Sequence, residues 1–146
     1  MQKKYNGFTL IEMMIVVAIV AVLASIAYAS YQSSITKSRR SDARDALMRT
    51  AALQEKHYLQ FNQYTITMDL IGGDTSIEEY YSIGAAFTIA GSGDCGDTDD
   101  RQCFTLTATT QGAQAQDDLC ASYTLDNLGR RAAVDGSNND TTDLCW

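Results

Sequence analysis

The chain has 146 residues, no proline and a formal net charge of −7. Its length suits one modest domain with an appendage. The acidic balance argues against nucleic-acid binding through overall charge, because nucleic-acid binders generally present a dense basic surface to the phosphates. A basic patch on a helix could still contact an acidic polymer, but solvated helix faces carry the same pattern of charges. We therefore predict no nucleic-acid partner from composition.

The N-terminal part of the sequence has a polar section and an apolar section. Residues 1–7 (MQKKYNG) are short and basic, and residues 8–31 are almost wholly apolar or small, with Glu12 as their one charge. As a helix, residues 8–31 would span roughly 36 Å, which is enough to cross a bilayer core. Lys3 and Lys4 predict that the N-terminus stays in the cytoplasm and that the remainder faces outward.

The helical pattern continues beyond the apolar section. No glycine or proline interrupts residues 32–59, and charged residues there alternate with small and apolar ones. We expect one helix from about Phe8 to about Leu59, apolar all round at first and amphipathic afterwards. A helix of this length exceeds what a globular domain needs, which suggests an assembly or a membrane tether. The residues expected on its apolar face are Ala43, Leu47, Ala51, Tyr58 and Phe61.

Strand-like runs follow a connecting region that contains Gly72 and Gly73. The second run alternates apolar residues with threonine, which predicts a strand with one covered face. The sequence LDNLGRR predicts a turn before the last run, with Asn127 and Gly129 able to take a positive φ. The expected fold class is α+β, with a long N-terminal helix packed on a short antiparallel β-sheet. The four runs are residues 80–91, 103–112, 119–129 and 130–136.

All four cysteines follow the apolar section, which predicts disulfides and an oxidising compartment. Three pairings are possible. We favour Cys95–Cys103, which closes a short loop rich in glycine and aspartate, and Cys120–Cys145, which holds the end of the sequence. In the chain-entropy model the second bond stabilises the fold by about 3 kcal/mol.

The sequence predicts no catalytic site, no metal and no cofactor. His57 is the one histidine of the chain and is expected at the surface or in a packing contact, so it offers little for zinc binding or for a catalytic triad. An acidic segment lacks the spacing of an EF-hand and is interpreted as a solvated loop. Its members are Asp94, Asp97, Asp99 and Asp100.

The sequence around Glu12 has a specific resemblance. GFTLIE, from Gly7 to Glu12, lies between a basic leader and an unbroken apolar run, and it resembles the signal of type IV pilins and pseudopilins. The resemblance implies cleavage after Gly7 by a prepilin peptidase and N-methylation of the new N-terminal residue, Phe8. In that family the apolar helix is retained, as membrane anchor and as filament core.

This resemblance gives Glu12 a chemical role in assembly. Cleavage would create a positive α-amine at Phe8 in a water-poor place. A carboxylate four residues along can neutralise the amine of its own chain or of a neighbouring subunit. Such a pair offsets the cost of a buried charge and sets the stagger between subunits.

The rest of the chain resembles PilE-type pilins. Its strand-like runs are similar to their sheet, and Cys120 and Cys145 occupy the places of their C-terminal loop disulfide. Two departures are present. Ala21 and Ala29 stand where many pilins have a helix-breaking glycine and proline, which argues against partial melting of the helix in a filament. The Cys95–Cys103 pair is not general in the family.

We therefore expect a structural subunit of a type IV pilus, a PilE-like minor pilin. The resemblance implies a single pass through the inner membrane with a periplasmic head, then incorporation into an extracellular pilus with other pilin subunits. The roles implied by the resemblance are pilus biogenesis, adhesion, twitching motility and DNA uptake. The alternatives are a type II secretion pseudopilin and a soluble binding domain cleaved after Ala29. The expected divisions are residues 1–7, leader; 8–31, transmembrane and filament-core helix; 32–59, amphipathic helix; and 60–146, globular head.

Overall fold

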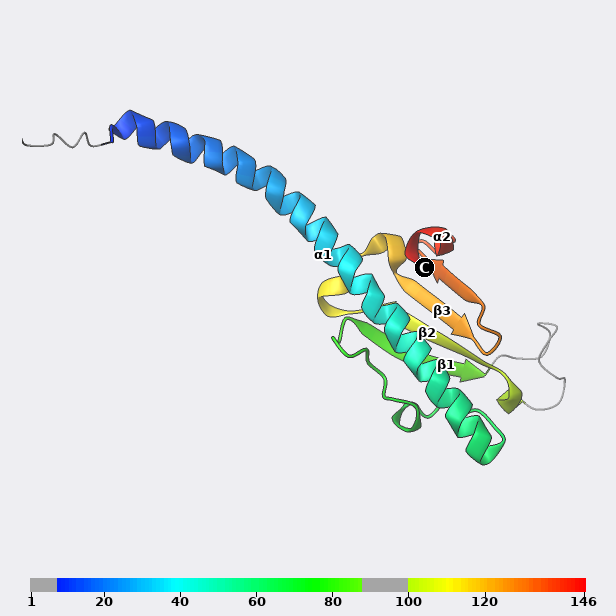
Figure 1. Cartoon of the computed structure of the whole chain (residues 1–146). Coiled ribbons are helices and arrows are strands. Elements are labelled where there is room, and N and C mark those ends of the chain that lie inside the picture. The colour runs from blue at the N-terminus through cyan, green and yellow to red at the C-terminus, as the bar shows by residue number, and fades with distance from the viewer. Residues whose placement is uncertain (1–7, 88–99) are drawn as a thin grey trace, which may run out of the picture. The chain divides into compact units, whose positions relative to one another are not determined.

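The computed structural model describes residues 8–87 and 100–146 (Figure 1). The chain forms two compact units, Met1–Ile35 and Thr36–Trp146, and we call the second the head unit. One helix, α1 (Leu10–Phe61), runs without interruption, because glycine and proline are absent from it. The predicted helix is confirmed, with both observed ends within two residues of those expected.

Each end of α1 has a capping residue. The Oγ1 atom of Thr9 accepts a hydrogen bond from the backbone N–H of Glu12 at 3.2 Å, which is the usual contact of an N-cap threonine. After the last helical residue, Asn62 adopts a positive φ of 54°, and its N–H donates to the carbonyl of Tyr58 at 2.7 Å. Asparagine is one of the few residues that tolerate this left-handed position after a helix.

Four strands form one antiparallel sheet in the order β1-β2-β3-β4, so each strand pairs with its neighbour in sequence. Every predicted run contains an observed strand, and residues 88–91 of the first run lie outside the described residues. The strands are β1 (Tyr81–Phe87), β2 (Phe104–Thr110), β3 (Ser122–Asp126) and β4 (Arg131–Val134). Shorter elements are η1 (Met68–Leu70), η2 (Asp100–Gln102), η3 (Gly112–Gln114), η4 (Asp118–Cys120) and α2 (Thr142–Cys145).

The core of the head unit lies between α1 and one face of the sheet (Figure 1). The helix contributes a buried stripe of mostly small side chains, which lets its backbone approach the strands closely. The sheet contributes alternate residues, and the expected alternation on β2 is confirmed because Phe104, Leu106 and Ala108 are buried while Thr109 is exposed. The helix residues of the stripe are Ala43, Ala46, Leu47, Thr50 and Gln54.

The predicted apolar face of α1 is only partly correct. Phe61 is 60% exposed, and its ring lies 4.5 Å from that of His57, centroid to centroid. The helix ends at this residue, where the amphipathic spacing no longer brings side chains into the core. The stripe instead includes two polar residues, Thr50 and Gln54, which apolar periodicity does not detect.

The predicted β3–β4 turn is present, and one of its two candidate residues takes a positive φ. Gly129 has a positive φ of 75°, but Asn127 is not among the described residues with positive φ. The Gly129 N–H donates to the Asp126 carbonyl at 3.0 Å, and the Asp126 Oδ1 atom accepts from the N–H groups of Leu128 and Arg130. A turn closed in this way needs one left-handed residue, and glycine takes that place.

Candidate functional site

The predicted processing and assembly residues lie at the start of α1. Phe8 is 80% exposed, and Glu12 is exposed in the first helical turn. A negative side chain at this position is also favoured by the helix dipole. Gly7 lies outside the described residues. Cleavage after Gly7, methylation of Phe8 and the pairing of Glu12 therefore stay predictions.

The large apolar side chains of α1 from Leu10 to Tyr31 are each at least half exposed within this chain. By length and composition, α1 is the one helix among the described residues that could cross a membrane. An exposed surface of this kind needs lipid or other apolar helices around it. This is the requirement that a membrane anchor or a filament core would meet.

The disulfide between Cys120 and Cys145 is present, as expected, across 25 positions of sequence. It joins η4, which precedes β3, to α2 near the end of the sequence. Cys103 is also disulfide-bonded. Its predicted partner, Cys95, lies outside the described residues, so the Cys95–Cys103 pair stays a prediction.

A buried polar cluster connects α1 to the segment between β2 and β3. The Arg40 guanidinium donates two hydrogen bonds of 2.7 Å, from Nε and Nη2, to the carboxylate of Asp117. The Gln114 Nε2 atom donates to Asp117 at 3.0 Å and to the carbonyl of Thr36 at 3.1 Å. The hydrogen bond to Asp117 raises the pKa of Arg40. The charge of Arg40 is therefore neutralised internally, and the cluster has a structural role.

A second set of basic residues lies near the surface, and two of its members contact Trp146. The Arg44 Nη1 atom donates to the backbone carbonyl of Trp146 at 3.1 Å, and the Arg131 Cζ atom lies 5.2 Å from the centroid of the Trp146 ring. Lys37 is exposed two helical turns before Arg44 and so shares its side of α1. Arg130 adjoins Arg131 and is held by Asp126 at 2.5 Å.

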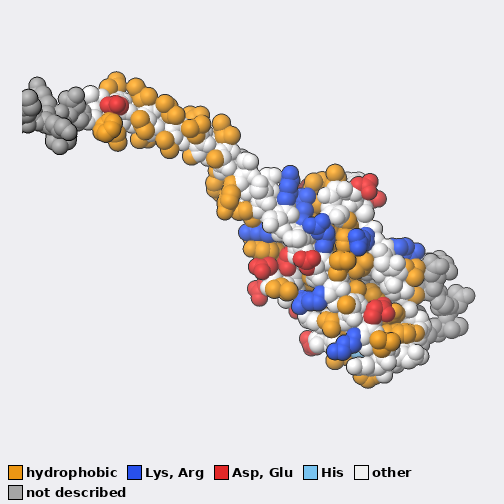
Figure 2. All heavy atoms as spheres, viewed as in Figure 1, with side chains coloured by type: hydrophobic (Ala, Val, Ile, Leu, Met, Phe, Trp, Pro, Cys, Tyr) orange, Lys and Arg blue, Asp and Glu red, His pale blue; other side chains and the backbone are white. Residues whose placement is uncertain are grey.

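We call Lys37, Arg44, Arg130 and Arg131 the basic face. Figure 2 shows Lys and Arg side chains gathered over the head part of α1 and across toward the side of β3 and β4. A shallow pocket beside Arg131 lies between α1 and β3. Its lining includes Met48 and Ala52 from α1 and Leu125 from β3. Lys37, Arg130 and Arg131 are exposed and Arg44 is half-buried, and arginine and lysine side chains at a surface can bind phosphate groups.

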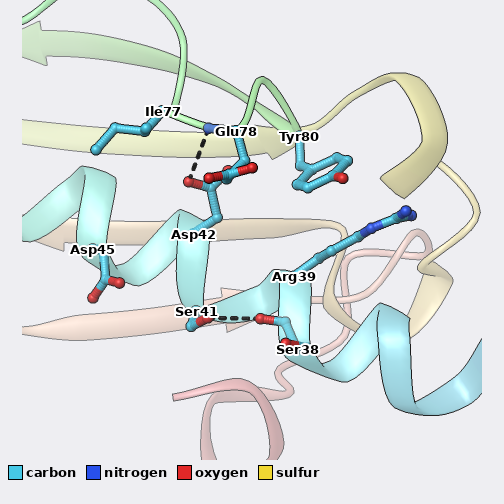
Figure 3. A pocket seen from close by; sticks show the side chains of 8 residues that line it. All are labelled: Ser38, Arg39, Ser41, Asp42, Asp45, Ile77, Glu78 and Tyr80. Carbon is cyan, nitrogen blue, oxygen red and sulfur yellow. Dashed lines mark hydrogen bonds between the residues drawn. The ribbon is translucent and has the colours of Figure 1, made fainter.

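An acidic groove lies on another part of the head unit, and Figure 3 shows its lining. Asp42 accepts a hydrogen bond from the backbone N–H of Glu78 at 3.4 Å, and its carboxylate lies beside Glu78, whereas Asp45 points away (Figure 3). Arg39 is stacked on Tyr80, with Cζ 4.4 Å from the ring centroid. Carboxylates predominate in this groove, so it disfavours phosphate.

The remaining residues considered for chemistry have packing roles. His57 contacts Phe61, and its Nδ1 atom is 2.9 Å from the carbonyl of Gln63. Within the described ranges, no three His, Cys, Asp or Glu side chains are placed to hold a metal ion. Asp94, Asp97 and Asp99 lie outside those ranges, and only the backbone of Asp100 lies within them.

Two parts of these sites were missed from sequence. Thr9 and Glu12 match the helix-start signature Thr-x-x-Glu, which would have placed the N-cap at Thr9. The cluster of Arg44, Arg131 and Trp146 has no comparable local signal, because its members are far apart in sequence and meet only in the folded head unit.

The chain matches two family models. The model described as "Type IV minor pilin ComP, DNA uptake sequence receptor" matches residues 29–124. The model described as "Prokaryotic N-terminal methylation motif" matches residues 2–28, the part that carries the predicted signal. No curated protein matches the chain.

Type IV pilins are among the solved structures that are similar to the chain. A type IV pilin from Shewanella oneidensis is 27% identical over 76% of this chain and 97% of its own, with a TM-score of 0.47. The non-core minor pilin PilV of Neisseria meningitidis is 19% identical over 73% of this chain and 94% of its own, with a TM-score of 0.52. The likeness to PilV shows the type IV pilin fold. Because the ComP model spans more than half of the sequence, the chain belongs to the ComP family of type IV minor pilins.

Proposed function

We propose that this protein is a minor subunit of a type IV pilus that binds DNA through the basic face of its head unit. The observation that carries the proposal is the ComP family match across residues 29–124, since that family is described as a DNA uptake sequence receptor. The geometry of the head unit supplies a surface with suitable chemistry.

The charge distribution supports DNA binding despite the net charge of −7. Binding to phosphates depends on local fields more than on total charge. The basic face presents four cationic side chains from α1 and the β3–β4 side, of which exposed Arg130 is paired with Asp126. Arg40 is largely buried in its pair with Asp117 and cannot contribute. The acidic groove around Asp42 would repel a polyanion, so DNA should approach from the side of the basic face.

The assembly route follows from the signal at the start of the chain. A prepilin peptidase would cleave after Gly7, and the mature chain would begin with N-methylated Phe8. Glu12 would then neutralise an α-amine, and the apolar part of α1 would pass from the inner membrane into the filament with other pilins. Absence of glycine and proline from α1 supports a filament in which this helix stays intact.

Adhesion and twitching motility are further roles of the pilus as a whole. As a minor subunit, this protein would support them through its incorporation into the filament. The proposed division of labour is a leader at residues 1–7, an anchor and filament core at 8–31, an amphipathic helix at 32–59 and a globular head at 60–146. The intact mass of the mature protein tests this route, since release after Ala29 would leave a chain that begins at Ser30.

DNA binding is tested with the full-length protein in detergent and a fluorescently labelled DNA duplex. The double variant Arg44→Ala/Arg131→Ala should bind the duplex more weakly than the wild type. The affinity of this variant for the duplex should also depend less on salt concentration, because each lost phosphate contact lowers the slope of log affinity against log salt by about 0.9.

A charge-matched control is Arg49→Ala/Lys56→Ala, which removes two exposed positive charges from α1 outside the basic face. It should retain most of the affinity. No salt-dependent binding by the wild type would refute a DNA receptor. Equal losses in the two double variants would refute the basic face as the binding surface.

A further inference from the structure

We propose that Trp146 is a positioning residue, which holds the guanidinium of Arg131 in the place where it binds a DNA phosphate. The inference rests on the proposed function and deepens it. It assigns to the last aromatic residue of the sequence a part in DNA binding without requiring that its ring contact DNA.

The contact between Arg131 and the Trp146 ring fixes one cation of the basic face. Arg131 lies at the start of β4, an edge strand of the sheet, and its side chain is exposed. An exposed arginine samples many rotamers and loses that freedom when it binds. Stacking on an indole ring at 5.2 Å restricts the guanidinium before DNA arrives. Its N–H groups stay at the ring surface and available to a phosphate oxygen.

The indole ring itself is fixed from several directions. Its Nε1–H donates to the carbonyl of Ala132 at 2.8 Å, one residue beyond Arg131. The Tyr123 ring packs edge-on, with centroids 5.9 Å apart and an interplanar angle of 73°. The preceding residue, Cys145, is joined to Cys120, and the Trp146 N–H donates to the Thr142 carbonyl at 3.0 Å. The ring is thus a rigid platform.

Trp146 also connects two of the three arginines of the basic face. Its backbone carbonyl accepts the hydrogen bond from Arg44 on α1, and its ring carries Arg131 on β4. One residue therefore contacts both cations, Arg44 through its backbone and Arg131 through its ring. Since Tyr123 and Arg131 already contact the ring, the geometry favours positioning over stacking of the ring on a DNA base.

The test compares salt dependence among variants that keep the protein's charge. Trp146→Leu retains apolar volume and removes the ring, and Trp146→Phe restores a ring without the N–H donor. We expect Trp146→Leu to bind the DNA duplex more weakly and to lower the salt slope by about 0.9, as Arg131→Ala would, although no charge is lost. Trp146→Phe should return the slope to near the wild-type value.

Two further variants make the comparison specific. Tyr80→Ala removes the other aromatic platform of the head unit, under Arg39, and should leave the slope unchanged. Trp146→Leu in the Arg131→Ala background should change the slope no further. Thermal unfolding of every variant is measured in parallel, and Trp146→Phe provides the ring comparison should Trp146→Leu fail to fold.

The outcomes separate the inference from the proposed function. If the wild type binds and Trp146→Leu keeps the wild-type slope, the positioning role is wrong while DNA binding stands. A loss of affinity without a change in slope would indicate stacking on a base and would also overturn it. If the wild type shows no salt-dependent binding to the duplex, both proposals fail together.

Discussion

The guanidinium of Arg40 and the carboxylate of Asp117 form a two-bonded ion pair across 77 positions of sequence, with both hydrogen bonds at 2.7 Å. Their side chains are 12% and 3% exposed. The pair joins α1 to the segment between β2 and β3, and Gln114 adds a further hydrogen bond to the same carboxylate.

Breaking this ion pair should destabilise the head unit. Arg40→Met leaves the buried charge of Asp117 without its cation, and such losses cost about 3 kcal/mol or more. Urea or thermal unfolding measures the change. Arg130→Met is the matched control, because its partner pair with Asp126 is more exposed and should contribute about 1 kcal/mol or less. Similar losses for the two variants would show that the Arg40 pair has no special weight.

Gln54 should be among the most sensitive polar residues of α1. It is fully buried, its Nε2 atom donates to the Thr65 carbonyl at 2.5 Å, and its Oε1 atom accepts the Thr65 N–H at 3.1 Å. Gln54→Leu leaves both backbone groups unpaired, for an expected loss of about 2 kcal/mol in the free energy of unfolding. Gln116→Leu, at an exposed position, should have little effect, and an equally small effect at Gln54 would contradict the prediction.

The Cys120–Cys145 bond should stabilise the head unit by about 3 kcal/mol in the chain-entropy model. Unfolding of Cys120→Ser/Cys145→Ser, compared with the wild type under non-reducing conditions, measures this contribution. Peptide mapping without reductant should recover Cys120 linked to Cys145 and, as predicted from sequence, Cys95 linked to Cys103. A peptide that links Cys103 to Cys120 would overturn both pairings.

Buried tyrosines should lower stability at alkaline pH. Burial is the main cause that raises the pKa of Tyr123 to about 12 and that of Tyr64 to about 12. A phenol whose pKa is higher in the folded state binds its proton more tightly there. The contribution of this protonated phenol to the free energy of unfolding is complete below the unfolded-state pKa of about 10. It is lost as pH rises from there toward about 12.

Tyr123→Phe isolates one of these groups. We expect the difference in unfolding free energy between wild type and variant to be constant below about pH 10 and to shift in favour of the variant above it. Chemical denaturation across this pH range measures the difference. Parallel loss of stability in the two proteins would rule out Tyr123 as a source of the alkaline effect.

Glu12→Ala should leave processing largely intact and impair incorporation into filaments, because the α-amine of Phe8 would lose its counter-charge. Sheared filaments and membranes, assayed separately for this subunit, measure incorporation. The processed chain should begin at Phe8 with one added methyl group. Normal incorporation of the Glu12→Ala chain would refute the role assigned to its carboxylate.

Local periodicity predicted the elements of this fold, but not all of their contacts. The helix and the strands follow from spacing that is visible within short segments, and the β2 alternation places Leu106 inside and Thr109 outside. The polar contacts that fix the head unit join distant segments, so no local pattern indicates that Arg40 meets Asp117. Asn127 and Gly129 were both candidates for the positive φ of the β3–β4 turn, and the hydrogen bonds to Asp126 give that place to Gly129.

The candidate site residues likewise fall into those that a local sequence pattern indicates and those that meet only in the folded head unit. Glu12 was found because a charge within an apolar run is conspicuous in sequence. The basic face was discounted because overall composition is acidic, and averaging over the chain conceals a local group of cations. Trp146 packs against Tyr123, and its contacts with Arg44 and Arg131 depend on how α1 and β4 meet.

Glu12 has two roles, in capping the helix start and in the proposed assembly, and the Thr9 cap assigns them to different parts of the residue. The hydroxyl oxygen of Thr9 accepts a hydrogen bond from the backbone N–H of Glu12, so this cap of the first turn does not use the Glu12 carboxylate. The carboxylate of Glu12 takes no part in the cap and is available to pair with an α-amine of a neighbouring subunit. Pairing of Glu12 with an adjacent subunit would therefore not require the first turn of α1 to unwind.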